Sequence, residues 1–168
     1  ATIVGEFVRK LIKDPAVKDC MDPRTELLLF YAARIELVEQ IIKPALKNGS
    51  WVLSDRFELS SFAYQGGGRK LDENMLHSLS SFCVQDCTPD LIVFLDIKPE
   101  HGLERAKRRG KLDRIEQESL DFFERVYESY HKHLKNLDNV EIIDAKKPLP
   151  VVQSIIREKL YHAIATVA

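Results

Sequence analysis

Cysteine is scarce in this chain, and neither a long hydrophobic run nor an excess of one charge is present. The three cysteines, Cys20, Cys83 and Cys87, are too few for a disulfide framework, and no nearby histidine completes a metal site. No apolar run approaches the roughly 20 residues of a membrane-spanning helix, and no signal-peptide pattern opens the chain. The net charge of -1 gives no general attraction to nucleic acid or anionic membranes. These absences predict a cytoplasmic protein with reduced thiols and only local anion sites.

The order of hydrophobic patterns predicts an α/β fold with a parallel sheet. Helical spacing starts at once in residues 1–12, and Asp22-Pro23 opens a long helix that we expect Pro44 and then Asn48-Gly49 to close. Strands are expected at residues 51–53, 91–95 and 140–143. Tens of helical residues separate these strands, which excludes hairpins and predicts parallel crossovers in a three-layer sheet.

Further boundaries follow from Gly, Pro and capping residues. The run Gly66–Gly68 is expected to break one helical segment, Asp72 to cap the next, and Pro99 to begin another. No repeat or linker divides the chain, so residues 1–168 form one expected domain. The first residues already have helical spacing and no strand precedes them, so we expect that an N-terminal segment of the parent protein is missing.

Asp55-Arg56 follows the expected strand 51–53 directly, and Ser60, Ser61, Tyr64 and Gln65 come soon after. In open α/β sheets, ligands bind at the carboxyl ends of the strands. Arg has a planar fork that matches two phosphate oxygens, so this set of residues predicts a site for a phosphorylated polar ligand. The Asp-Arg pair by itself is also compatible with a plain surface ion pair.

Phe30 and Arg34 lie four residues apart in the long helix and therefore share a face. A ring beside a guanidinium can stack on a planar base while the guanidinium bonds the edge of that base. Burial in the hydrophobic core is the alternative for a Phe in a Leu-rich helix.

Six cations occur within the ten residues from Arg105 to Arg114, with Gly110 among them. Few acids lie within the run, so the like charges repel one another unless an anion is bound. A mobile basic lid over a polyphosphate, at about residues 105–118, explains both the charge and the glycine. The alternative is a solvated helix face. His131 and His133, further on, are also expected to be solvated.

Several segments together resemble thymidylate kinase, in order along almost the whole chain. They are TELLLFYAAR, SDRF, SSFAYQGGGR, RAKRRGKLDRIEQES and IDA before Pro148. SDRF followed by SSFAYQG carries the resemblance most specifically. LDRIE after an arginine-rich approach is similar to the bacterial type of the family, in which the lid supplies the catalytic arginine.

The resemblance implies a role for each matching residue. Phe30 stacks on thymine, and Arg34 bonds its exocyclic oxygen. Ser61 and Gln65 lie at the other edge of the base. Tyr64 lies against the deoxyribose, and the phosphate of dTMP is held by Arg9 and Arg56. Asp55 positions the acceptor and the water network of magnesium. On the ATP side the implied residues are Arg105 at the adenine, Arg109 at the transferred phosphoryl group, Arg114 in the closed lid, and Asp144 and Ala145 bordering the adenine.

The implied activity is ATP-dependent phosphorylation of dTMP to dTDP in a P-loop fold of the nucleoside monophosphate kinase type. The implied ligands are ATP, with Mg²⁺ that no dedicated protein site holds, and dTMP; a homodimer is implied as well. The phosphate-binding motif GxxxxGKS/T is absent from the 168 residues, so this polypeptide is expected to be inactive and its full-length parent active. A kinase for another pyrimidine nucleotide, and a non-catalytic nucleotide-binding or dimerisation module, remain the alternatives.

Overall fold

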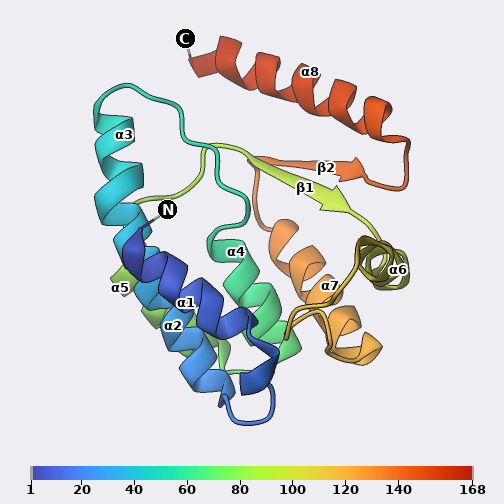
Figure 1. Cartoon of the computed structure of the whole chain (residues 1–168). Coiled ribbons are helices and arrows are strands. Elements are labelled where there is room, and N and C mark those ends of the chain that lie inside the picture. The colour runs from blue at the N-terminus through green and yellow to red at the C-terminus, as the bar shows by residue number, and fades with distance from the viewer. Residues whose placement is uncertain (1, 168) are drawn as a thin grey trace.

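The computed structural model of the chain describes residues 2–167, with side chains through residue 165. This part of the chain forms eight α-helices and two strands, and five of the helices precede the first strand (Figure 1). The helices are α1 (Ile3–Lys13), α2 (Pro23–Leu37), α3 (Lys43–Lys47), α4 (Glu58–Ser61), α5 (Glu73–Cys83), α6 (Pro99–Arg109), α7 (Leu120–Leu134) and α8 (Leu149–Val167). Two π-helical segments, η2 (Val38–Ile42) and η3 (Phe62–Gly68), and a 3-10 turn, η1 (Pro15–Val17), complete the set.

The strands β1 (Ile92–Asp96) and β2 (Val140–Asp144) pair in parallel, with Ile92 opposite Val140 and Asp96 opposite Asp144. This confirms the parallel α/β class and two of the three expected strands. In Figure 1 the strand pair lies between α8 and α7. The sheet therefore has a helix on either side of it in the described part of the chain.

The expected strand at residues 51–53 is wrong, because this segment has no regular secondary structure. Trp51 is 64% exposed and Leu53 is 92% exposed, so neither belongs to the core. A strand requires a neighbour for its backbone groups. Among the described residues only β1 and β2 form such a pair.

Capping explains where several helices begin. Asp22 accepts a hydrogen bond from the Arg24 amide at 2.8 Å with Pro23 in the first turn, and Asp72 accepts one from the Met75 amide at 2.9 Å, as the sequence predicts. The Thr2 hydroxyl likewise caps α1 by accepting from Gly5 at 3.0 Å. Thus α1 begins at its own cap.

Pro44 does not close the long helix, contrary to expectation. A proline inside a helix lacks an N–H and collides with the carbonyl four residues earlier. The π-helical segment η2 precedes Pro44 and widens the turn, so the helix continues through α3. The helix ends at Lys47, and the expected stop at Asn48-Gly49 is confirmed. Gly49 has a left-handed φ of 72°, the Ser50 amide donates to the Ala45 carbonyl at 3.0 Å, and the Gly49 amide donates to the Leu46 carbonyl at 2.9 Å.

The glycine run forms the last three residues of η3, and the helical segment ends at Gly68, as the sequence predicts. Its function is close packing against α7. A Cβ on Gly67 would lie 2.5 Å from the Ser129 Cβ, and one on Gly68 would lie 2.5 Å from the Phe122 ring. Glycine is therefore required here so that the two helices can approach each other.

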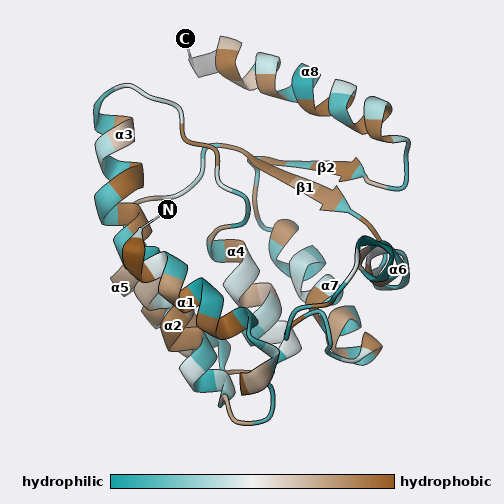
Figure 2. Ribbon diagram, in the orientation of Figure 1, coloured by the Kyte–Doolittle hydropathy of each residue, from teal (hydrophilic) through white to brown (hydrophobic). Residues whose placement is uncertain are grey.

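Two clusters of buried side chains hold the helices together. Leu27, Tyr31, Phe62, Leu76 and Cys83 join α2, η3 and α5, while Ala63, Phe122 and Val126 join η3 to α7. In contrast, α6 is hydrophilic almost all round (Figure 2) and none of its side chains is buried. No helix within residues 2–167 is both long and apolar enough to cross a membrane.

Candidate functional site

A buried ion pair joins α2 to the segment that begins α4. Arg34 Nη1 donates to Glu58 Oε2 at 2.8 Å, and Tyr31 donates its hydroxyl proton to Glu58 Oε1 at 2.5 Å. The Arg34 guanidinium also lies 5.0 Å from the Tyr31 ring centroid and 5.7 Å from that of Phe57. Burial, with the negative Glu58 as acceptor, raises the pKa of Tyr31 well above its ordinary value. The head of Arg34 is thus fixed by one carboxylate and two rings.

Asp55 and Arg56 occupy a tight turn immediately before α4. Arg56 has a φ of 66°, which is uncommon for a residue with a side chain and costs on the order of 1 kcal/mol or more. Ser54 supports this conformation by donating its hydroxyl proton to the Arg56 carbonyl at 2.7 Å. The Arg56 guanidinium lies 4.9 Å from the Tyr64 ring centroid. The strained turn therefore directs a cation toward the aromatic side chain of Tyr64.

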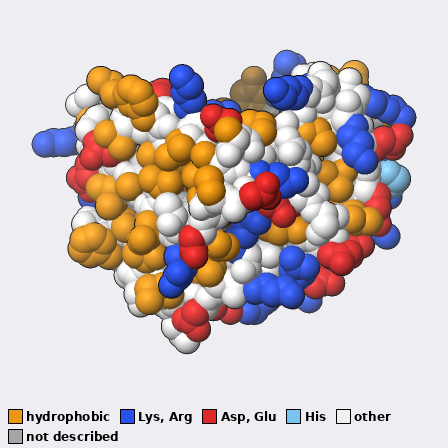
Figure 3. All heavy atoms as spheres, turned by 60° about the horizontal axis from the view of Figure 1, so that its bottom comes forward, with side chains coloured by type: hydrophobic (Ala, Val, Ile, Leu, Met, Phe, Trp, Pro, Cys, Tyr) orange, Lys and Arg blue, Asp and Glu red, His pale blue; other side chains and the backbone are white. Residues whose placement is uncertain are grey.

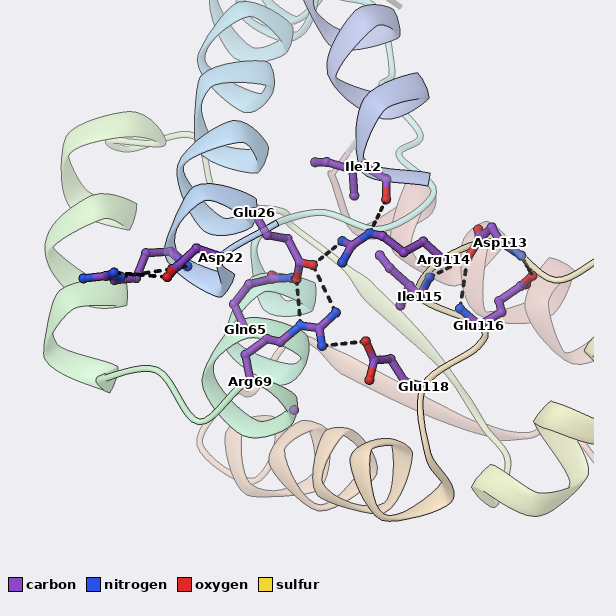
Figure 4. Close-up of polar contacts among 12 residues, drawn as sticks. Ile12, Asp22, Glu26, Gln65, Arg69, Asp113, Arg114, Ile115, Glu116 and Glu118 are labelled. Atoms are coloured by element: carbon purple, nitrogen blue, oxygen red, sulfur yellow. Dashed lines mark hydrogen bonds and ion pairs between the residues drawn. The ribbon is translucent and has the colours of Figure 1, made fainter. Parts of the chain in front are cut away.

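Glu26 is the centre of a buried polar cluster, which we call the Glu26 hub (Figure 4). Gln65 Nε2 donates to Glu26 Oε1 at 2.8 Å, Arg69 donates to both carboxylate oxygens at 3.2 and 3.1 Å, and Arg114 donates to Oε2. Arg69 also donates to Glu118 at 2.6 Å. Burial raises the pKa of Glu26, but the hydrogen bonds from Arg69, Arg114 and Gln65 outweigh this and lower it below its ordinary value. Glu26 is therefore a buried carboxylate that stays ionised.

The hub ties the end of the basic segment to the first two helices. Arg114 is 2% exposed and donates its Nε to the Ile12 carbonyl at 2.6 Å, and Lys13 forms an ion pair of 2.8 Å with Asp113. Arg109 stays at the surface, where it pairs with Glu116. Arg108 pairs with Glu104 at 2.5 Å.

These pairs correct the argument that the basic segment needs a bound anion to relieve its repulsion. Glu104, Glu116 and Glu26 supply carboxylates from outside the run or from the far side of the fold. The charge of the segment is therefore partly balanced within the protein.

The sequence-predicted residues fall into two groups in the structure. Arg34, Arg56, Ser61, Tyr64 and Gln65 lie on α2 or on the stretch from the Arg56 turn to η3, and α2 is bonded to that stretch through Glu58 and Glu26. Phe30 is half-buried on the same α2 helix. Both Ser61 and Gln65 are 2% exposed. The helices α2, α4 and η3 therefore hold one half of the candidate site.

The remaining predicted residues lie elsewhere in the described structure. Arg9 is exposed on α1 and Arg105 is exposed on α6. Asp144 ends β2 opposite Asp96 of β1, and the Ala145 amide donates to the Asp96 carbonyl at 2.8 Å. Among the described residues, none of these positions forms a hydrogen bond or an ion pair with Arg34 or Gln65. A ligand that spans both groups would have to bridge α2 and the carboxyl ends of the strands.

Sequence reasoning missed Glu26 and Glu58, the two acids that fix Gln65 and Arg34. Both occur next to recognised residues, yet a lone glutamate in a helix usually faces water. The histidine prediction is wrong as well. His133 Nε2 lies 3.0 Å from Glu73 and its ring is 5.1 Å from that of Phe62, while His131 lies 3.3 Å from Asp96. Both histidines are packed between helices or against the sheet.

A parallel α/β fold with Arg34 on α2 and Arg56 in the turn before α4 is compatible with a nucleotide-binding α/β protein. The sequence model of thymidylate kinase matches residues 1–156. Two curated thymidylate kinases of Legionella pneumophila, from strains Corby and Paris, are 54% and 53% identical to the chain over 163 residues, which cover 97% of this chain and 77% of each relative. The chain belongs to the thymidylate kinase family, whose fold is that of P-loop NTPases and whose reaction is ATP-dependent phosphorylation of dTMP to dTDP.

Proposed function

We propose that α2 and the stretch from the Arg56 turn to η3 form the dTMP half of the kinase site. Phe30 stacks on thymine and Arg34 donates to its exocyclic oxygen. Ser61 and Gln65 meet the other edge of the base, and Tyr64 lies against the deoxyribose. The observation that carries this proposal is the Arg34 head, 9% exposed and held by Glu58 beside two rings. A guanidinium fixed in this way loses little freedom when a planar ligand binds.

The phosphate of dTMP is proposed to bind Arg56 and Arg9. Arg56 is preset by its left-handed turn and by the Tyr64 ring, which supports a role that repays the backbone strain. Asp55 precedes it and would position the acceptor phosphate and the water around magnesium. Because the acceptor is a phosphate that is already ionised at neutral pH, the reaction needs alignment and positive charge more than a strong base.

On the donor side we propose that α6 and the following loop close over ATP. Arg109 approaches the transferred phosphoryl group, Arg105 lies at the adenine, and Arg114 anchors the lid to the Glu26 hub. Asp144 and Ala145 at the end of β2 border the adenine. The exposure of α6 and its weak surface ion pairs, one of which holds Arg109, support a segment that can move.

Mg²⁺ is proposed to arrive with ATP. No cluster of three or more His, Cys, Asp or Glu side chains within residues 2–165 could hold a metal ion, whereas Mg²⁺ commonly binds through phosphates, waters and one or two carboxylates. Asp55 is a single exposed carboxylate and fits that smaller part. When bound, the ion would neutralise charge on the phosphates during transfer.

The test of the acceptor site is calorimetric titration of the chain with dTMP. We expect Arg34→Ala to abolish measurable binding and Arg24→Ala, an exposed arginine on the same helix that pairs with Asp22, to leave it unchanged. Equal affinities for the two variants would contradict the proposed site.

The reaction itself is tested by dTDP formation from ATP and dTMP with the complete gene product. A panel of dTMP, dUMP and deoxynucleosides distinguishes the base and acceptor preference. Binding of dTMP without any dTDP formation by that product would favour a non-catalytic nucleotide-binding module. The 168 residues contain no GxxxxGKS/T loop, so we expect this chain alone to bind dTMP without making dTDP.

We also propose a homodimer packed through helices. Hydrophobic side chains gather on one side of the face drawn in Figure 3. On α1, Ile3 is 79% and Phe7 is 71% exposed, and Leu11 one turn further on is 44% exposed. An exposed apolar stripe of this kind is typical of a protein contact. Phe7→Glu is expected to shift the mass measured by light scattering from dimer to monomer, while Arg9→Glu on the same helix tests for a purely electrostatic effect.

We propose two further features for the complete protein. The sheet is expected to be three-layered, which the positions of α7 and α8 on either side of β1 and β2 support (Figure 1). The relatives are bacterial, and a kinase that draws on ATP and dTMP is expected to work in the cytoplasm.

A further inference from the structure

Gln65 and Glu26 form a buried side-chain hydrogen bond between η3 and α2. Glu26 is 1% exposed and Gln65 is 2% exposed, and the bond from Gln65 Nε2 to Glu26 Oε1 is 2.8 Å long. Figure 4 shows the Gln65 side chain directed at the Glu26 carboxylate, which Arg69 and Arg114 flank. The environment of this amide is therefore set by a charged neighbour.

The direction of the Gln65 amide follows from the charge of Glu26. An ionised carboxylate has only acceptor oxygens, whereas an amide has a donor end and an acceptor end. Arg69 and Arg114 keep Glu26 ionised, as the lowered pKa of this carboxyl indicates. Gln65 must therefore donate its Nε2 protons to Glu26, and its Oε1 is the end that stays available to accept.

We propose that Glu26 is a positioning residue for base specificity: it orients Gln65 so that Oε1 accepts a proton from the ring nitrogen N3 of the pyrimidine. This inference rests on the proposed contact of Gln65 with the base. Thymine and uracil carry a proton on N3, whereas cytosine presents a lone pair there. A fixed acceptor therefore forms a hydrogen bond with N3 of thymine and repels the lone pair on N3 of cytosine. This repulsion discriminates more strongly than the mere loss of a hydrogen bond to cytosine would.

The same geometry connects base recognition to the lid. Glu26 Oε1 holds Gln65, and Oε2 of the same carboxylate holds Arg114 from the end of the lid. Arg114 also bonds the Ile12 carbonyl, so its position is shared with the end of α1. A change at Glu26 is expected to alter the choice of base as well as the stability of the fold.

The experiment compares dTMP and dCMP affinities by calorimetry in four forms of the protein. In Glu26→Gln the new amide can donate to Gln65 as well as accept from it, so the Gln65 amide is no longer held in one orientation. The dTMP to dCMP affinity ratio is therefore expected to fall about tenfold or more. The double variant Glu26→Gln with Gln65→Glu exchanges the two groups. Residue 65 then has only acceptors and residue 26 can donate to it, so the ratio is expected to return to within about threefold of the wild type.

Glu118→Gln is the matched control for charge. It removes a carboxylate from Arg69 of the same hub without touching the Gln65 amide. This variant is expected to lower the melting temperature but to keep the wild-type affinity ratio. A ratio that stays unchanged in Glu26→Gln, or that the double variant does not restore, would overturn the proposal.

Two further measurements cover the remaining outcomes. Gln65→Ala tests the contact of Gln65 with the base. If its dTMP to dCMP affinity ratio equals that of the wild type, the proposed base site is wrong. If the ratio changes in Gln65→Ala but stays at the wild-type value in Glu26→Gln, only the role of Glu26 is wrong. If Glu26→Gln does not fold, nuclear magnetic resonance of the wild type decides. The Gln65 amide protons should exchange slowly with and without dTMP, and amide protons that turn toward the bound base would refute the orientation.

Discussion

Arg34 and Glu58 form an ion pair in which both side chains are withdrawn from water, with 9% and 15% of their surface exposed and 2.8 Å between Nη1 and Oε2. A buried pair of this kind is costly to break, because the remaining charge has no partner. It also fixes the direction of the guanidinium that we place at the thymine edge.

Glu58→Ala is therefore expected to lower the free energy of unfolding by about 3 kcal/mol and to weaken dTMP binding. The loss includes the hydrogen bond from Tyr31 to the same carboxylate. Glu39→Ala removes an exposed pair with Lys43 on the same helical stretch and is expected to cost less than about 0.5 kcal/mol. Urea denaturation of both variants measures the difference, and equal costs would show that burial of the pair is unimportant.

The two neighbouring arginines at the end of α6 provide a matched test of the lid. Arg109→Ala is expected to lower kcat for dTDP formation by about 10²- to 10³-fold, because a cation near the transferred phosphoryl group is removed. Arg108→Ala takes away the same charge from the adjacent position, where Arg108 pairs with Glu104. We expect kcat to change less than about threefold in this control. Steady-state kinetics of the complete gene product separates the two, and similar losses would point to general electrostatics.

Gly68 packs where no side chain fits. A Cβ at this position would meet the Phe122 ring at 2.5 Å and Val126 Cγ2 at 2.9 Å, so Gly68→Ala is expected to cost about 1–3 kcal/mol of stability. Gly102 lies within α6, and the nearest atom to a Cβ there is 3.9 Å away. Gly102→Ala is expected to stabilise the protein by up to about 1 kcal/mol. If the glycine run is needed for helix packing, the melting temperature falls in Gly68→Ala and rises in Gly102→Ala.

His133 makes stability depend on pH just below neutrality. Burial lowers the pKa of His133 from its ordinary value of 6.5, and the nearby Lys132 and His77 act in the same direction against the attraction of Glu73. The unfolded chain then binds more protons than the folded protein, so stability is complete above pH 6.5 and is lost as pH falls through the lower folded pKa.

In His133→Leu, which keeps an apolar contact with Phe62, this part of the pH dependence is expected to vanish. Urea unfolding at several values between pH 5 and 8 measures it. The wild type and the variant should have parallel profiles above neutrality and diverge below it. A variant that keeps the wild-type slope would show that another group is responsible.

The comparison of prediction and structure shows which features are local. The caps at Asp22 and Asp72 and the strands near residues 91–95 and 140–143 follow from the residues themselves, because a capping oxygen or a β-branched run acts over a few neighbours. The errors occurred at Pro44 and at residues 51–53. A π-helical turn decided the first outcome and the lack of a neighbouring strand among the described residues decided the second. The close approach of the glycine run to α7 was also invisible in the sequence.

The candidate site divides in the same way. The sequence by itself determined the kind of chemistry, since Arg34, Arg56, Tyr64 and Gln65 occur in an order that matches a known family. Only the tertiary structure decided what holds them, because Glu26 and Glu58 act on residues 39 and 24 positions away along the chain. Charge pairing across helices depends on the distance between side chains in space, and the residue pattern within one helix does not determine that distance.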